Sequence, residues 1–207
     1  YLNHKHHHNF NFADVPLIYQ ALLGDHGLDE TGVQLQYVMP LPVYVMVGVE
    51  ALEGENEQSF GTDAFNGVDK VSKPGLWVGY VKSSVDIGGG TLLGGISMAK
   101  GDSRIDHLED EEDAHAFAAD TTLYDVELIY KKYFAADHVI TWQSEYLYRN
   151  MDGIQYDVNA TGTSIEKEQA GFYSELVYQY DRNWRTGVRY SAITQNDISL
   201  NPDIPDD

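Results

Sequence analysis

The chain has 207 residues, no cysteine and a formal charge of −20, from 33 acidic and 13 basic side chains. With 43% hydrophobic and 12% aromatic residues it can bury a core, which excludes a disordered acidic tail. The acid excess argues against a nucleic-acid partner, and the missing cysteines exclude disulfides, thiolate catalysis and cysteine-built zinc sites.

The chain opens on a histidine-rich tract, His4-Lys5-His6-His7-His8. Alternate residues of an extended chain lie on one side, so two of these imidazoles could chelate zinc or another divalent cation. We therefore predict a metal site at His4, His6, His7 and His8. A solvated polar tract is the alternative, because a histidine-rich run is a compositional signal only.

Residues 1–32 form a predicted loop that contains one short helix, over 17–23. Pro16 suits the first helical position, Asp14 lies near the capping position, and Gly24 can end the helix. This segment either folds inward as a constriction or lies at a rim. The sequence does not decide between the two.

Residues 33–194 show apolar and polar positions in alternation, the period of β-strands, arranged as four hairpins. The predicted strand pairs are 33–39 with 43–53, 76–86 with 91–100, 121–133 with 139–149, and 170–180 with 184–194. Short turns join each pair, and long polar loops (54–75, 101–120 and 150–169) separate them. Residues 195–207 form a predicted polar tail, and the whole chain is one domain.

Each strand has an apolar face and a charged face, which alone does not say which face is buried. Aromatic residues lie at both ends of the apolar faces: Tyr37, Tyr130, Tyr178, Tyr180 and Trp184 near short turns, Tyr146 and Tyr148 near a long loop. Two such girdles are typical of a membrane barrel, as is the segregation of short turns from long loops. Ordinary β-propensity in a soluble sheet is the alternative.

Two stretches of the chain resemble bacterial outer-membrane porins of the phosphate-selective-porin-like type, some of which are described as zinc-regulated. The residues that carry the resemblance are Phe12-Ala13-Asp14-Val15-Pro16-Leu17-Ile18-Tyr19, Leu22-Leu23-Gly24, Gly32-Val33-Gln34-Leu35, Gly171-Phe172-Tyr173, Tyr178-Gln179-Tyr180 and Trp184-Arg185-Thr186-Gly187-Val188-Arg189-Tyr190. The resemblance implies a barrel of about 16–18 strands. We therefore expect an all-β, antiparallel transmembrane β-barrel with about eight strands here, as part of a larger barrel.

The charged faces would then line a lumen. The predicted pore-lining residues are Glu50, Lys82, Asp125, Glu127, Lys131, Glu145, Arg149, Glu175, Arg185 and Arg189. Their mixed signs suit a general diffusion pore. Phosphate selectivity is not expected, because it would need a ladder of Arg and Lys, whereas acids here match the bases. The acidic run from Asp106 to Asp120 lacks the spacing of a calcium loop and is typical of a solvated face.

The sequence thus predicts a porin-like channel of the bacterial outer membrane for passive diffusion of small polar or ionic solutes. We expect outer-membrane lipid and lipopolysaccharide as its surroundings, allow for a homo-oligomer, and find no enzyme motif. Two alternatives stay open: a Zn²⁺-binding surface protein that uses the histidine-rich and acidic loops, and a soluble acidic β-barrel that binds an apolar ligand.

Overall fold

The computed structural model describes residues 11–56, 58–65, 67–107, 115–135, 137–159 and 161–200. Within these ranges the chain forms one helix and nine strands. They are α1 (Leu17–Leu23), β1 (Gly32–Val38), β2 (Tyr44–Leu52), β3 (Leu76–Ile87), β4 (Gly90–His107), β5 (His115–Ala135), β6 (His138–Tyr156), β7 (Gly162–Gln179), β8 (Arg185–Ile193) and β9 (Asp197–Leu200).

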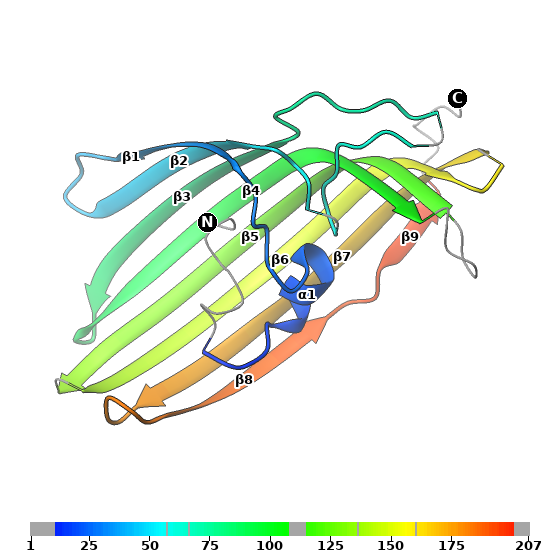
Figure 1. Cartoon of the computed structure of the whole chain (residues 1–207). Coiled ribbons are helices and arrows are strands. Elements are labelled where there is room, and N and C mark those ends of the chain that lie inside the picture. The colour runs from blue at the N-terminus through cyan, green and yellow to red at the C-terminus, as the bar shows by residue number, and fades with distance from the viewer. Residues whose placement is uncertain are drawn as a thin grey trace.

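The strands form a single antiparallel sheet in which β1 to β8 follow one another in chain order, and β9 pairs with β7 beyond the end of β8. The sheet is curved, and its concave side faces α1 (Figure 1). Across the described strands it does not close: β1 and β8 form its two edges. The predicted all-β antiparallel fold with four hairpins is confirmed, whereas this chain by itself makes a trough rather than a barrel.

Strands β4 to β7 are longer than the sequence predicted. Residues 101–107 and 115–120 extend β4 and β5, and residues 150–156 and 162–169 extend β6 and β7, where long loops were expected. A second apolar cluster explains the extension: Phe117, Ala119, Met151 and Ile165 pack together, with Ile105 against them. The prediction of loops was wrong because the apolar residues in these extensions are few and the face opposite them mixes small, apolar and polar residues, such as Ala118, Ile154 and Asp152, which weakens the alternation.

The predicted tail contains a short strand, since β9 pairs with β7 from Ile165 to Glu168. Residues 201–207 lie outside the described residues. Helix α1 has the predicted bounds, but Pro16 takes the N-cap position and no side chain caps the helix. Asp14 was expected near the cap; its carboxylate instead lies 2.6 Å from the Arg189 guanidinium.

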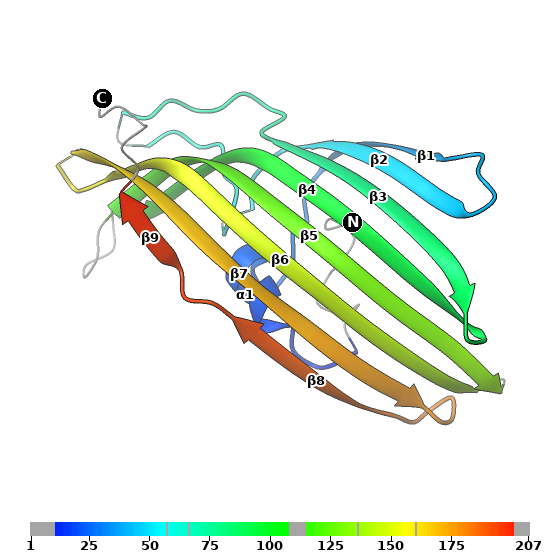
Figure 2. The ribbon, with the colours of Figure 1, turned by 180° about the vertical axis from the view of Figure 1, so that it is seen from behind.

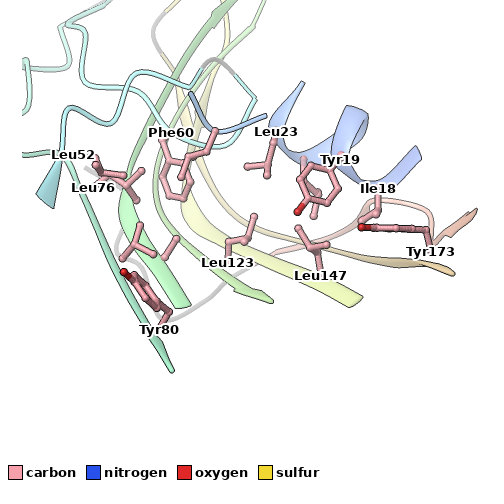
Figure 3. Packing of buried hydrophobic residues seen from close by; sticks show 14 residues of the cluster. Ile18, Tyr19, Leu23, Leu52, Phe60, Leu76, Tyr80, Leu123, Leu147 and Tyr173 are labelled. Carbon is pink, nitrogen blue, oxygen red and sulfur yellow. The ribbon is translucent and has the colours of Figure 1, made fainter. Parts of the chain in front are cut away.

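The main core lies on the concave side of the sheet, between the sheet and α1. The cluster joins Ile18, Tyr19, Leu22, Leu23 and Leu28 of the N-terminal segment to Phe60 of the loop between β2 and β3, and to Leu52, Leu76, Val78, Tyr80, Ala99, Leu123, Leu147 and Tyr173 of the strands (Figure 3). In the part of the chain that the structure describes, no helix has the length and hydropathy needed to span a bilayer.

Candidate functional site

The two faces of the sheet differ in which side chains they expose. On the concave face Glu50, Glu127 and Glu145 are each only 2% exposed, whereas Leu35 and Val188 on the convex face are 72% and 70% exposed. Figure 2 shows the ribbon from the convex side of the sheet. The apolar side chains on this side are exposed to the surroundings. Its exposed large residues include Leu35, Tyr37, Val49, Trp77, Val81, Ile96, Met98, Tyr124, Val126, Leu128, Tyr146, Phe172, Leu176, Tyr178, Val188 and Tyr190.

The strand register places all ten predicted pore-lining residues on the concave face. Directly paired residues in neighbouring strands share a face. One such row runs from Lys82 through Gly95, Glu127 and Glu145 to Tyr173. Glu50, Asp125, Glu127, Glu145, Arg149 and Glu175 are buried there, Lys82 and Arg189 are partly buried, and Lys131 and Arg185 are exposed near the short turns.

Lys82 and Glu127 form an ion pair although a whole strand separates them. The residue between them in the row is Gly95, and a Cβ at that position would lie 2.8 Å from Glu127 Oε1. The missing side chain thus provides the space for the carboxylate. One basic and one acidic lining residue therefore neutralise each other inside the trough.

Glu145 is the centre of a second buried contact. Tyr19 of α1 donates a hydrogen bond to Glu145 Oε1 at 2.6 Å, and Tyr173 of β7 donates to Oε2 at 2.7 Å. Gln143 Nε2 donates in turn to the Tyr173 hydroxyl at 2.6 Å. The rings of Tyr19 and Tyr173 meet edge to face, with centroids 6.2 Å apart. The carboxylate is thereby satisfied by phenols from a helix and a strand.

Arg149 ties the loop between β2 and β3 to the strands. Its guanidinium donates to the Gln58 carbonyl at 2.9 Å, to Ser59 Oγ at 3.1 Å and to Gln169 Oε1 at 3.1 Å. Ser59 Oγ also donates to the carbonyl of Leu22, at the end of α1. Loop, helix and sheet are therefore joined around one buried cation.

Two further buried carboxylates are each held by one amide. Gln34 donates to Glu50 Oε1 at 2.5 Å, and Asn11 donates to Glu175 Oε1 at 2.7 Å. The second oxygen of each carboxylate is buried without a hydrogen-bond partner among the described atoms. Such groups are costly in a dry interior, which favours water beside them.

Helix α1 lies against the sheet at a glycine. A Cβ at position 171 of β7 would lie 2.7 Å from Ile18 Cδ1, so Gly171 admits the helix to close contact. The sequence gave no signal for the contact between Tyr173 and Tyr19. The sequence also gave no signal that Gly95 makes space for the Glu127 carboxylate or that Gly171 lets Ile18 approach β7.

The predicted metal residues His4, His6, His7 and His8 lie outside the described residues. His107 and His115, expected in a loop, are instead paired across β4 and β5, with ring centroids 5.5 Å apart. Two imidazoles at such a spacing fit a shared divalent cation. Among the described residues, no group of three or more His, Asp or Glu side chains is arranged to hold a metal.

No family model matches the chain, and no solved structure matches it. The chain is similar to a protein of Aquifex aeolicus (strain VF5) described only as uncharacterized, with 44% identity over 214 residues. That match covers the whole chain but 45% of the relative, so the chain spans less than half the length of the curated relative it matches. The resemblance to porins stays a prediction.

Proposed function

We propose that the chain forms part of the wall of an outer-membrane β-barrel that acts as a passive channel for small polar or ionic solutes. The observation that carries this proposal is the convex face, which exposes large apolar side chains from every strand from β1 to β8. The concave face holds buried carboxylates next to the core under α1. Monomeric soluble proteins rarely expose a contiguous apolar patch larger than a few hundred Å². A lipid-facing exterior and a polar interior are what a transmembrane barrel requires.

The extent of the apolar stripe supports the same proposal. On β5 the outward positions from Thr122 to Tyr130 are uncharged, and Asp120 and Lys132 bound them at either end. A transmembrane strand needs about 9–11 residues. The stripe is therefore long enough to cross the apolar part of a bilayer.

The two edges of the sheet indicate how the barrel would close. An unpaired edge cannot stand in lipid, because its backbone N–H and C=O groups would lack partners. The relative is more than twice as long as its match to this chain. We propose that strands supplied by the rest of a longer protein pair with β1 and β8 and complete a barrel of about 16–18 strands.

Planar bilayers test the channel directly. The protein produced from its complete coding sequence should be extracted only with detergent and should give stepwise conductance increments when it is added to the bilayer. A protein that stays monodisperse in plain buffer and gives no increments would refute the proposal. Such a result would favour the soluble β-barrel instead.

A second candidate function, metal capture at the rim, is favoured by the pairing of His107 with His115. Zn²⁺ titration by calorimetry would test it on the wild type and on His107→Ala and His115→Ala variants. His138→Ala, at the opposite end of the sheet, is the matched control. We expect weaker binding for the first two variants only; equal affinity in all proteins would remove this candidate.

A further inference from the structure

We propose that α1 is a fixed constriction inside the channel, held in place by a latch of Tyr19, Glu145 and Tyr173. The inference deepens the proposed function and rests on it. It assigns these residues the task of limiting which solutes pass.

The position of α1 is the first observation. Ile18 and Leu22, one helical turn apart, are fully buried against the sheet, whereas Leu17 and Gln20 are exposed. Helix residues four apart share a face, so α1 turns one side to the wall and the other to the open trough. If the sheet closes into a barrel, that second side faces the lumen. The helix then occupies part of the cross-section.

The latch is the second observation. Figure 3 shows Tyr19 and Tyr173 beside each other at the concave surface, one from the helix and one from β7. Both hydroxyls donate to the Glu145 carboxylate, at 2.6 Å and 2.7 Å, and Glu145 is 2% exposed. A buried carboxylate that lost either donor would be left poorly satisfied. Undocking of α1 is therefore unfavourable.

Contacts on both sides of the helix add to the latch. Before it, the Asp14 carboxylate lies 2.6 Å from the Arg189 guanidinium. After it, Asn56 Nδ2 donates to the carbonyls of Leu23 and Gly27, each at 3.0 Å. Contacts before, within and after α1 therefore hold the helix in one position, so it is a fixed element rather than a mobile lid.

A cysteine at position 20 tests the position of the helix, because the chain has no cysteine of its own. The Gln20→Cys variant of the full-length protein would be treated in a planar bilayer with a charged, membrane-impermeant thiosulfonate. We expect a partial loss of conductance in every open channel. Val188→Cys, on the apolar convex face, is the control and should keep its conductance.

A Tyr19→Phe variant tests the latch, because it removes one hydroxyl and keeps the ring. We expect a noisier open channel and passage of larger uncharged polymers than the wild type admits. Tyr146→Phe makes the same change on the outward face of the strand that carries Glu145, and it should behave as the wild type.

The outcomes separate the two proposals. A wild type without conductance would refute the channel and this inference together. A conducting wild type whose Gln20→Cys variant is fully labelled with no change in conductance would overturn the constriction alone. Identical noise and polymer exclusion in Tyr19→Phe and Tyr146→Phe would overturn the role of the latch.

Discussion

Gly95 and Glu127 are paired across β4 and β5, and the carboxylate of Glu127 lies where a side chain at position 95 would stand. This arrangement lets Glu127 reach Lys82 on the far side of β4. Substitution of Gly95 by valine would push the carboxylate away from its partner. We expect the free energy of unfolding in detergent micelles to fall by about 1–3 kcal/mol, the usual cost of overpacking.

Gly79→Val is the matched control for this prediction. It makes the same change on the neighbouring strand, at a site where no described atom lies within 4 Å of the place that a Cβ would take. Its unfolding midpoint in urea should stay near that of the wild type. Equal losses for Gly95→Val and Gly79→Val would show that the space over Gly95 has no special role.

The contact between Ile18 and Gly171 predicts coupling between helix and sheet. Gly171→Ala should displace Ile18 and also press on β8, because the new Cβ would lie 2.7 Å from Ile18 Cδ1 and 2.7 Å from the carbonyl oxygen of Ala192. We expect faster proteolysis within residues 11–31. Shortening the partner by Ile18→Val should restore part of the protection, and a double-mutant cycle measures the coupling. Fully additive effects, with no rescue by Ile18→Val, would assign the loss to the contact with β8 and contradict a role for Ile18.

Because the convex face is apolar, we expect a charge introduced there to destabilise the protein in a bilayer. Val126→Lys places a cation near the middle of the apolar stripe of β5, and we expect it to destabilise the protein in lipid vesicles by about 2–4 kcal/mol. Ser72→Lys, in the exposed loop before β3, should have little effect. Unfolding by guanidinium in vesicles measures both, and similar values for the two variants would argue against lipid contact.

A row of carboxylates crosses the loop end of the convex face. Asp120 is paired with Asp102 on one side and with Asp152 on the other, and Asp152 is paired with Glu166. Like charges directly opposite one another are destabilising. We expect Asp120→Asn to raise stability by about 0.2–1 kcal/mol in a chelator-containing buffer, as measured by thermal unfolding. Asp25→Asn is the control, and the same gain there would assign the effect to net charge.

The turn between β6 and β7 should make the stability of the fold depend on pH. The backbone N–H groups of Thr161 and Asn159 donate to Asp157 Oδ1, at 2.8 Å and 2.9 Å, and hold the pKa of Asp157 below its ordinary value of 3.8. A depressed pKa in the folded state gives stability that is present above pH 3.8 and is lost as the pH falls through the folded-state pKa.

The amide NMR shift of Thr161 should therefore titrate with a midpoint below 3.8. The Asp157→Asn variant keeps an acceptor oxygen without a titrating group, so its Thr161 shift should be constant over the same range. A midpoint at or above the ordinary value in the wild type would contradict the assignment.

Much of the sheet could be predicted from the sequence because alternation reports directly on the two faces of a strand. The hairpin turns, the bounds of α1 and the shared face of the ten charged residues were predicted correctly. Alternation alone could not give the orientation, because a charged face and an apolar face alternate equally well in a soluble protein. The aromatic girdles and the resemblance to porins led us to expect the charged faces inside, and the charged residues do lie on the concave face. The exposed fractions of the side chains decide the orientation: Glu145 on the concave face is 2% exposed, and Val188 on the convex face is 70% exposed.

The contacts of α1 could not be predicted for a different reason. Tyr19 and Glu145 are separated by 126 positions in the chain, and no local pattern links a phenol in a helix to a carboxylate in a distant strand. The ends of β4 to β7 were missed because Phe117 and Met151 alternate with residues that are polar or small. Strand β9 was not predicted, because it has only four residues and polar residues lie on both sides of it.

The order of the strands has a consequence for how the protein assembles. From β1 to β8 every pairing joins neighbours in the chain, so the sheet can grow one hairpin at a time. Helix α1 precedes the strands in the chain but can dock only after β6 and β7 are in place, because these strands carry Glu145 and Tyr173. Its docking is therefore a late event, and the element that fills the trough does not obstruct the wall while the wall is being built.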